Sequence, residues 1–317
     1  MKIIEKIPIE SKSDLLYLKY RLYKMSLPNE SGYIFAAMEL GTNILKYAQK
    51  GYALILQEDD STILAFCDNG PGIAYLEKAK QKGYTTHSNS LGLGLYQLSQ
   101  SNFFLLDIFT STNSHLHGTV ALVIPKELDQ QAWYLSRPFL SEEHNGDFFA
   151  KKGKFLLFGD ASGHNKKSHK SAQFIVDLFF HSPLSCLMAQ DFFETIHQKL
   201  QKQHLRSAVF SLIEMLKNHV QICGVGNIDI WHITPVATTY HSLESGIVGE
   251  SLFTVTNLDF SLEKKDKIAL CTDGIQKTYA KEILSARLHP ATMAVALIHF
   301  CADPLDDAST LIIRNVS

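Results

Sequence analysis

The spacing of hydrophobic residues changes along the chain near residue 125. Before that point, stretches in which apolar and polar residues alternate, as in strands, are mixed with stretches whose apolar residues recur every three or four positions, as in helices. This order predicts an α+β sandwich layout. The expected strands are 2–9, 52–57, 62–68, 104–110 and 118–124, and the expected helices are 13–25 and 31–49.

After residue 125 comes a polar stretch, followed by a series of short strand-like segments. One helical block, between Ser171 and His204, interrupts them, and the spacing of its apolar residues indicates helices that pack onto a sheet. We place a domain boundary near Glu127, which gives one domain over residues 1–126 and a second over residues 128–317. The strands expected in the second domain are 208–215, 219–224, 228–233, 267–272 and 310–314.

Length and composition agree with two globular domains. At about 150 residues per domain, a chain of 317 residues corresponds to roughly two domains. Hydrophobic residues make up 45% and charged residues 20%, which is ordinary globular usage and argues against a disordered chain or a long coiled coil. The net charge of −2 leaves no positive excess for a nucleic-acid backbone, so no nucleic-acid partner is expected.

The sequence also predicts a cytoplasmic protein that does not insert into a membrane. Glu5 and Glu10 interrupt any apolar segment of signal-peptide length at the start. The most apolar later stretches, 103–109 and 291–302, are too short to cross a bilayer. The five cysteines are scattered and form no Cys-x-x-Cys pair, which argues against a disulfide framework and a zinc site and fits a reducing compartment.

Two polar residues of the expected helix 31–49, Glu39 and Asn43, stand four positions apart. On a helix they project from the same face, one turn from each other. Such a pair can serve a magnesium nucleotide, because the amide oxygen can bind the metal and the carboxylate can accept a proton from a nucleophile.

The segment after the strand 62–68 carries a second signal. Asp68 ends that apolar strand, and a carboxylate there can accept a hydrogen bond from an exocyclic amine, the group by which adenine differs from guanine. Gly70 and Gly72 follow at two-residue spacing, and glycine lets the backbone approach a ligand closely.

Further along, Gly92 and Gly94 form a glycine turn that opens a predicted helix. Free backbone N–H groups and the helix dipole favour phosphate at such a position. Thr119, at the start of the next strand, carries a hydroxyl that can reach the same ligand. The sequence therefore predicts a nucleotide site assembled from four separated motifs.

In order and context, these motifs resemble those of the GHKL ATPases, whose nucleotide-binding fold is also called the Bergerat fold. The resemblance covers about residues 1–126 and is greatest to the anti-sigma and switch protein kinases of the RsbW and RsbT type, RsbT more closely. Residues 39–43 match the N box, residues 68–72 the G1 box, residues 90–95 the G2 box and residues 118–119 the closing motif.

This resemblance implies an α/β sandwich that binds ATP with Mg²⁺ and phosphorylates Ser or Thr on a protein partner, typically a STAS-domain antagonist. By the same resemblance, Glu39 is the general base, Asn43 is the magnesium ligand and Asp68 is the residue that binds adenine. Histidine kinases share the fold but need a phosphoacceptor hairpin before it, for which this chain has no room.

In the second domain, acidic residues stand at the ends of predicted strands. Asp147 and Asp160 flank two strands joined by a tight turn at residues 152–153, and counting outward from that turn pairs Asp147 near Phe158. The two acids therefore finish at the same end of the hairpin. Two carboxylates brought together repel each other unless protons or cations intervene.

Two further strand-terminal acids follow, Asp273 and the pair Asp306 and Asp307. A set of aspartates without cysteine or suitably spaced histidine is a hard oxygen site of the kind that binds Mg²⁺ or Mn²⁺. Two such metals can activate water and clamp a phosphoryl group for in-line displacement. The pattern thus favours phosphoester hydrolysis.

These residues are similar to the motifs of the PPM family of metal-dependent Ser/Thr phosphatases, in its SpoIIE or RsbX branch. The resemblance covers about residues 128–317 and implies an α-β-β-α sandwich. It implies that Asp147, Asp160 and Asp273 are catalytic metal ligands, joined by the backbone carbonyl of Ala161. Asp306 aligns better than Asp307 with the last metal ligand, and the choice between them stays open. The matching segments are 146–148, 159–164, 224–227, 272–274 and 306–307.

One departure from the family pattern concerns the usual Gly-His-Gly, which here ends in Asn165. Because asparagine tolerates left-handed backbone better than most residues, we expect the turn to survive.

Together the two resemblances lead to a bifunctional regulator, in which an ATP-dependent Ser/Thr kinase is fused to a metal-dependent phosphoprotein phosphatase that acts on STAS-type partners. A rival hypothesis is an ATP-binding module that captures a partner and gates the phosphatase without phosphoryl transfer. In a third, the second domain is a catalytically dead scaffold. The sequence leaves the oligomeric state open, a homodimer included.

Overall fold

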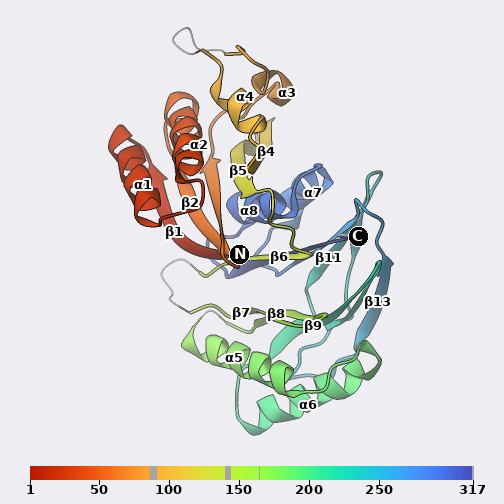
Figure 1. Cartoon of the computed structure of the whole chain (residues 1–317). Coiled ribbons are helices and arrows are strands. Elements are labelled where there is room, and N and C mark those ends of the chain that lie inside the picture. The colour runs from red at the N-terminus through yellow and green to blue at the C-terminus, as the bar shows by residue number, and fades with distance from the viewer. Residues whose placement is uncertain (86–90, 140–143, 164, 316–317) are drawn as a thin grey trace. The chain divides into compact units, whose positions relative to one another are not determined.

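The computed structural model describes residues 1–85, 91–139, 144–163 and 165–315 (Figure 1). Ser90 and His164, which belong to two of the motifs above, lie outside the described residues. The chain divides into two compact units. The first contains Met1–Gln130 and also Ala291–His299, and the second contains Gln131–Pro290 and Phe300–Ser317.

The first unit is built on a five-stranded antiparallel sheet with the strand order β1-β2-β3-β5-β4. Its two long helices, α1 and α2, pack on one face of this sheet, and α2 continues directly into a π-helical turn, η1. The elements are β1 (Lys2–Ile9), α1 (Lys12–Lys24), α2 (Glu30–Asn43), η1 (Ile44–Ala48), β2 (Gly51–Glu58), β3 (Ser61–Asp68), α3 (Leu76–Ala79), α4 (Gly94–Ser99), β4 (Phe104–Asn113) and β5 (Leu116–Pro125).

Local sequence explains where α1 begins and which face it buries. Ser11 and Asp14 form a capping box, in which each side chain satisfies a backbone N–H of the first turn. Leu15, Leu18 and Leu22 recur at helical spacing and are buried against the sheet. The strands and helices expected in this region are confirmed to within a few residues, except that the expected helix 31–49 changes to π-helical geometry after Asn43.

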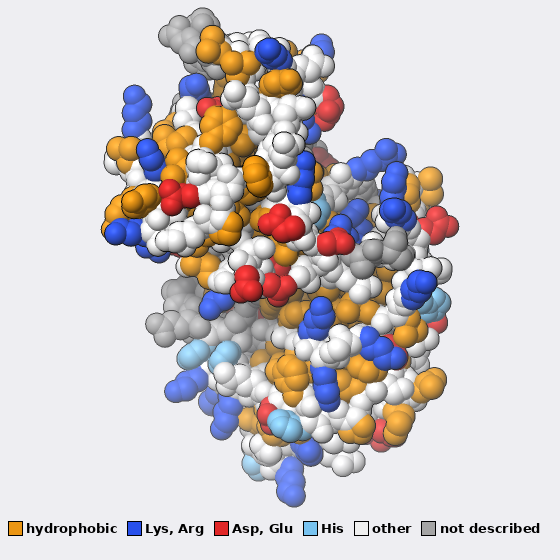
Figure 2. Space-filling model, viewed as in Figure 1, with side chains coloured by type: hydrophobic (Ala, Val, Ile, Leu, Met, Phe, Trp, Pro, Cys, Tyr) orange, Lys and Arg blue, Asp and Glu red, His pale blue; other side chains and the backbone are white. Residues whose placement is uncertain are grey.

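The outward side of α1 is unusually apolar for a surface helix. Figure 2 shows hydrophobic side chains on the surface over this helix, at the left of the view. The exposed fractions of the four large ones lie between 48% and 62%: Leu16, Tyr17, Tyr20 and Tyr23.

The second unit contains two five-stranded antiparallel sheets, with the orders β13-β10-β9-β8-β7 and β12-β11-β14-β15-β6. Their facing sides share a core that includes Phe158, Ile213 and Ile222 from the first of these sheets and Leu270 and Ile313 from the second. The strands are β6 (Ala132–Arg137), β7 (Asp147–Lys152), β8 (Phe155–Ala161), β9 (Ala208–Leu216), β10 (His219–Val225), β11 (Asp229–Ile233), β12 (Thr238–His241), β13 (Thr256–Ser261), β14 (Lys267–Cys271) and β15 (Ala308–Arg314).

Helices cover the outer side of the β7-containing sheet. Ile175, Phe179, Phe193 and Ile196 of this layer pack with Phe210 of β9 in a second core. The helical block predicted between Ser171 and His204 is therefore confirmed as a layer packed on a sheet, although it consists of two helices and a short turn. The helical elements after residue 165 are α5 (Lys166–His181), the 3₁₀ turn η2 (Cys186–Met188), α6 (Ala189–Lys202), α7 (Lys277–Ser285) and α8 (Pro290–Cys301). Residues 291–299 of α8 belong to the first unit.

The hairpin that carries the first two acids differs from its predicted register. The loop consists of Gly153 and Lys154, and Lys152 pairs with Phe155. Because this loop is centred one residue later than expected, Asp147 pairs directly with Asp160, and Phe158 pairs with Phe149. The pairing of Asp147 near Phe158 was therefore wrong, and the expectation that the two acids finish at the same end is confirmed.

In the described part of the chain, no single helix is long and apolar enough to span a membrane, and one bent pair, Lys166–His181 with Cys186–Lys202, meets the requirement only by length and composition.

Candidate functional site

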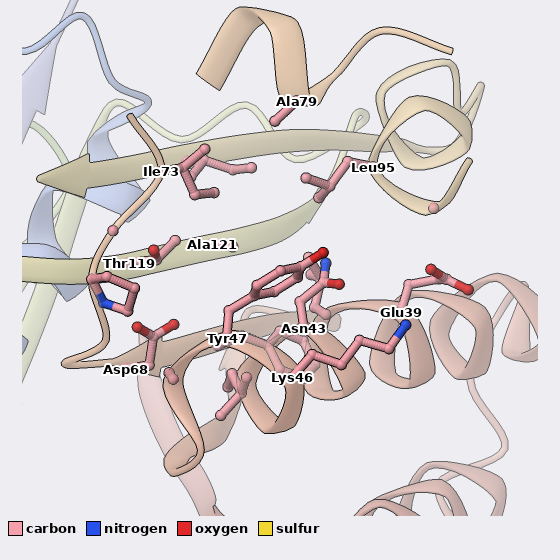
Figure 3. A pocket seen from close by; sticks show the side chains of 18 of the residues that line it. Glu39, Asn43, Lys46, Tyr47, Asp68, Ile73, Ala79, Leu95, Thr119 and Ala121 are labelled. Carbon is pink, nitrogen blue, oxygen red and sulfur yellow. The ribbon is translucent and has the colours of Figure 1, made fainter. Parts of the chain in front are cut away.

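A cavity of about 480 Å³ opens in the first unit beside α2, η1 and the end of β3 (Figure 3). A volume of several hundred Å³ is typical of sites for small molecules and cofactors. Seven of the residues predicted to bind a nucleotide line this one cavity: Glu39, Asn43, Asp68, Gly72, Gly92, Gly94 and Thr119.

Glu39 and Asn43 lie one turn apart on α2, and both border the cavity. Gly94 approaches Glu39 so closely that a Cβ atom added to it would lie 1.8 Å from the Oε2 atom of Glu39. The start of α4 is therefore in contact with the carboxylate, and only glycine fits at that point. Two motifs that are 55 positions apart in the sequence meet here.

The π-helical turn η1 follows Asn43 without a break and adds Lys46 and Tyr47 to the cavity wall (Figure 3). Such turns are rare inside helices and occur often at functional sites. The sequence interpretation missed both residues. Lys46 could have been found, because it stands three positions after Asn43 and so shares its helical face.

Asp68 ends β3, and its carboxylate is held by local backbone groups at one side of the cavity. The N–H of Gly70 donates to Oδ1 of Asp68 at 2.8 Å, which gives Gly70 its place in the motif. Burial raises the pKa of the Asp68 carboxyl, and the backbone hydrogen bonds from Gly70 and Thr119 lower it.

The glycines around Asp68 are required by close approach. Gly72 has φ +73°, and a Cβ there would lie 2.2 Å from the carbonyl oxygen of Ser111. The N–H of Ile73 then donates to Oγ1 of Thr110 at 2.8 Å, and that oxygen also lies 3.3 Å from Oγ1 of Thr119. The loop after Asp68 is thus bound to β4 and β5.

His299 adds a contact from far along the sequence. It lies in the segment 291–299 of the first unit, and its Nε2 atom lies 3.2 Å from the backbone oxygen of Asp68. Its Nδ1 atom lies 2.8 Å from the hydroxyl of Tyr52. The sequence interpretation, which treated the first domain as continuous, did not predict this support of the Asp68 backbone.

The second group of predicted residues lies in the second unit, at the paired ends of β7 and β8. Asp147 is only 6% exposed, and its Oδ2 atom accepts a hydrogen bond from Thr272 at 3.0 Å. Its Oδ1 atom is buried and has no hydrogen-bond partner among the described residues. A buried carboxylate oxygen without a donor is costly unless a proton or a cation satisfies it.

The neighbouring carboxylates act on one another. Burial and then the charge of Asp160 raise the pKa of Asp147 well above its usual range. Burial, followed by the charges of Asp273, Asp306 and Asp307, raises the pKa of Asp160 to about 7. All of these acids therefore contribute negative potential at one edge of the unit.

Asp273 and the acids after residue 305 are held in different ways. Oδ2 of Asp273 accepts a hydrogen bond from Nδ2 of Asn227 at 2.7 Å. The two oxygens of Asp307 accept backbone N–H groups of Phe139 at 2.6 Å and Gly146 at 2.8 Å, and this side chain is only 2% exposed. Asp307 therefore supports the segment before β7, whereas Asp306 stands half-buried beside it.

Backbone groups complete this edge. The N–H of Ala161 donates to the carbonyl oxygen of Gly146 at 3.1 Å. A Cβ on Gly146 would lie 2.8 Å from the carbonyl oxygen of Ala161, so glycine keeps that oxygen accessible from the β7 side. A Cβ on Gly274 would lie 1.9 Å from the backbone carbonyl oxygen of Asp307, so only glycine fits directly after Asp273.

Asn165 serves a different purpose from the one expected. Its φ is −135°, which is extended backbone, so the proposed left-handed turn at this residue was wrong. Its side chain accepts the N–H of Lys167 at 2.9 Å and forms a capping box with Ser168 at the start of α5. The left-handed position is Gly163, with φ +94°.

As their side chains stand, no three His, Cys, Asp or Glu residues of the described segments are close enough together to hold a metal ion. The chemistry of the donors nevertheless fits a hard divalent cation. They are all oxygens, they are mutually repulsive, and one of them, Oδ1 of Asp147, is buried without a partner.

The sequence profile of Stage II sporulation protein E (SpoIIE) matches residues 151–315, which is 165 of the 317 residues. The chain belongs to the SpoIIE family. The matched segment lies within the second unit's part of the sequence except for residues 291–299. No curated protein matches the chain.

Solved structures extend this result to the fold. The S. agalactiae serine/threonine phosphatase is 11% identical with a TM-score of 0.51, and the match covers 58% of this chain and 98% of that one. A bacterial serine phosphatase is 12% identical with a TM-score of 0.50, over 58% of this chain and 97% of that one. RsbX in complex with magnesium is 17% identical with a TM-score of 0.49, over 65% of this chain and 98% of that one. The first two of these matches show that this SpoIIE-family chain contains the fold of those phosphatases.

Proposed function

We propose that the second unit is a metal-dependent phosphatase that hydrolyses phosphoserine or phosphothreonine on a protein. The observation that carries this proposal is the direct pairing of Asp147 with Asp160 at the ends of β7 and β8, where Oδ1 of Asp147 is buried without a hydrogen-bond partner among the described residues. Carboxylates that raise one another's pKa at a strand end are poised for a cation. Membership of the SpoIIE family supports the same function.

The residues proposed to hold Mg²⁺ or Mn²⁺ are Asp147, Asp160, Asp273 and Asp306, together with the carbonyl oxygen of Ala161. When bound, such ions supply Lewis acidity and neutralise charge on a phosphoryl group. The other residues orient the ligands: Thr272 fixes one oxygen of Asp147, and Asn227 fixes one oxygen of Asp273. Asp306 is preferred over Asp307 because both oxygens of Asp307 already accept backbone N–H groups.

Phosphate release from a phosphorylated STAS-domain protein tests this assignment. We expect the full chain to release phosphate with Mn²⁺, and Asp160→Ala or Asp273→Ala to reduce the rate by at least about 100-fold, since each change removes a proposed metal ligand. Asp259→Ala, on the partly exposed strand β13, is the matched control and should leave the rate unchanged. Equal turnover by wild type and Asp160→Ala would remove the phosphatase assignment.

For the first unit we propose an ATP-dependent protein kinase of the GHKL type, on a separate observation. Seven predicted residues from four motifs line a single cavity, with Glu39 and Asn43 on one side and Asp68 on another. In this proposal Asp68 binds the adenine amine, Asn43 holds Mg²⁺, and Glu39 accepts the proton of the attacking hydroxyl. Lys46, in the same wall, is available to neutralise phosphate charge.

The alternative is an ATP-binding module that captures a partner and gates the phosphatase without phosphoryl transfer. A carboxylate in contact with the glycine turn, as Glu39 is, favours the kinase, because a pure binding module needs no base there. Incubation of the full chain with labelled ATP and a STAS-domain partner separates the two proposals. Label on the partner, lost in Glu39→Gln with nucleotide affinity retained, supports the kinase, and capture without label supports the module.

Opposed activities on one phosphosite would only consume ATP. We therefore propose that the two units address different STAS-type partners in a partner-switching system, or that one unit is restrained while the other works. Phosphosite mapping of each partner after incubation with the full chain distinguishes these arrangements. Separate sites for the two units support the first arrangement, and one shared site supports the second.

A further inference from the structure

Two of the five cysteines lie next to each other in the second unit, beside the carboxylate of Glu214 and apart from the proposed metal ligands. Cys186 opens the 3₁₀ turn η2 between α5 and α6, and Cys223 lies in the centre of β10. The Sγ atom of Cys223 lies 3.7 Å from the backbone oxygen of Cys186, and the Sγ atom of Cys186 lies 3.9 Å from the backbone oxygen of Gln221, two residues before Cys223. Both are free thiols.

The two cysteines differ in their access to solvent. Cys223 is 2% exposed and belongs to the core beneath α5 and α6. Cys186 is half-buried at the edge of that core, and the next residue in the turn, Leu187, is 95% exposed. A small oxidant can therefore reach the pair from the side of the turn.

The two thiols differ in acidity. The neighbouring Cys186 lowers the pKa of Cys223, whereas the neighbouring Cys223 raises the pKa of Cys186, and the charge of Glu214 opposes ionisation of both. Thiolates, rather than thiols, are the species that react with peroxides.

We infer that Cys186 and Cys223 form a reversible disulfide when the protein meets an oxidant of the hydroperoxide class. A thiolate of the pair attacks one peroxide oxygen and the O–O bond breaks. The cysteine becomes a sulfenic acid, and the departing hydroxide takes up the proton that the thiol lost and leaves as water. The second thiol attacks that sulfur, the S–O bond breaks, and a second water is released. Overall, two thiols and one H₂O₂ give one disulfide and two H₂O: both sulfurs are oxidised and both peroxide oxygens are reduced.

The bond would fasten the connection between α5 and α6 to strand β10. It would close a loop between positions 37 residues apart, and closing a loop of that length restricts the unfolded chain more than the folded one. Because the Cys223 thiol already lies against the backbone of Cys186, a rotation of the two side chains brings the sulfurs together. Oxidation should therefore stabilise the second unit reversibly, and this expectation does not depend on either proposed activity.

Mass spectrometry of the full chain tests the inference. After brief exposure to a small excess of H₂O₂ and alkylation, we expect an intact mass with two alkyl groups fewer than the reduced protein. A non-reduced digest should contain one peptide pair joined through Cys186 and Cys223. Thermal unfolding of the same sample should occur several degrees higher than that of the reduced protein, and dithiothreitol should reverse the shift.

Variants provide the controls. Cys186→Ser should abolish both the linked peptide and the thermal shift. Cys67→Ser should retain both, because Cys67 is fully buried in the first unit and contacts Tyr52 rather than a second thiol. The digest of the wild-type chain decides the question even if a variant folds poorly. Oxidation that stops at a sulfinic acid on Cys186, disulfides between chains only, or five alkylated thiols after peroxide would each overturn the inference.

Discussion

The residues that orient the proposed metal ligands are as specific as the ligands themselves. Asp307, adjacent to Asp306, uses both carboxylate oxygens to hold backbone N–H groups before β7, so two neighbouring aspartates have different tasks. Asn227 orients Asp273 directly, because its Nδ2 atom donates a hydrogen bond of 2.7 Å to Oδ2 of Asp273. The sequence contains these residues in recognisable motifs, but a motif does not reveal which oxygen is already satisfied.

Replacement of Asn227 tests how much the orientation of Asp273 contributes to phosphate release. Asn227→Ala removes the hydrogen bond to Asp273 without removing a proposed ligand. Residues that orient metal ligands typically contribute about 10–100-fold in affinity or activity. We therefore expect phosphate release to fall by that factor and to be partly restored by higher Mn²⁺. Gln201→Ala, on the exposed side of α6, should have no effect. A fall that excess Mn²⁺ leaves unchanged would argue against an effect through the metal.

His289 should make the stability of the second unit depend on pH. Burial, and then the charges of Arg314 and Lys267, lower its pKa to about 3. The imidazole is thus neutral in the folded state at a pH where the unfolded chain begins to bind a proton. Its stabilising contribution is fully present above about pH 6.5 and is lost progressively as the pH falls toward 3.

The predicted size of this effect is about 1–2 kcal/mol at pH 5 relative to pH 7.5. His289→Phe keeps a ring against Trp133, whose centroid lies 4.9 Å from that of His289, and should flatten the pH dependence of the unfolding midpoint. The exposed residue His115 offers a control, since His115→Ala should leave the slope unchanged. An equally steep slope in His289→Phe would show that other groups cause it.

At the level of elements, the sequence predicted the periodic segments well and the register of one hairpin poorly. The strands and helices with clear apolar periods were placed within a few residues, because burial of one face is encoded locally. The pairing of Asp147 depended on where a two-residue loop is centred, and one residue of error there moves every pair by two. Short edge strands were missed altogether: β6, β12 and β13.

The first turn of α5 is stabilised by the side chain of Asn165. Asn165 caps the helix, so Asn165→Ala should lower the free energy of unfolding by about 1 kcal/mol, as the loss of a side-chain cap generally does. Asn165→Gly, which recreates the Gly-His-Gly of the family, should cost only a few tenths of a kcal/mol. Denaturant unfolding measures both.

Activity of the same variants bears on the hypothesis of a dead scaffold. If Asn165 serves only as a cap, phosphate release by Asn165→Gly should equal that of the wild type. A large gain in activity on restoring glycine would instead mean that the asparagine had weakened the catalytic loop.

At the scale of the whole chain, the first unit is not continuous in sequence. Residues 291–299 belong to it, and His299 contacts both the backbone of Asp68 and the side chain of Tyr52. From the sequence we expected a single boundary near Glu127, where a polar stretch separates the two patterns. No comparable polar stretch marks the two later points at which the chain enters and leaves the first unit. A segment that returns after 160 residues has no local signature.

A fragment of residues 1–130 should therefore be incomplete. Without residues 291–299 it loses the contacts of His299, so we expect it to bind a hydrophobic dye and to unfold at a lower denaturant concentration than the same fragment with residues 289–301 attached through a flexible linker. As a control, attachment of a scrambled 289–301 segment should not restore the fold. A stable fragment 1–130 without dye binding would contradict the assignment of residues 291–299 to this unit.

On the scale of the molecule's activity, we propose that the carboxylate edge of the second unit performs metal-dependent hydrolysis. The most direct measurement is phosphate release from a phosphoserine protein by the full chain in ¹⁸O-labelled water, as a function of Mn²⁺. We expect no release with a chelator, saturable release with Mn²⁺, one ¹⁸O atom in each phosphate, and loss of all of this in Asp160→Asn. Release that persists with chelator or in Asp160→Asn, or Mn²⁺ binding without any hydrolysis of phosphoserine proteins or p-nitrophenyl phosphate, would contradict it.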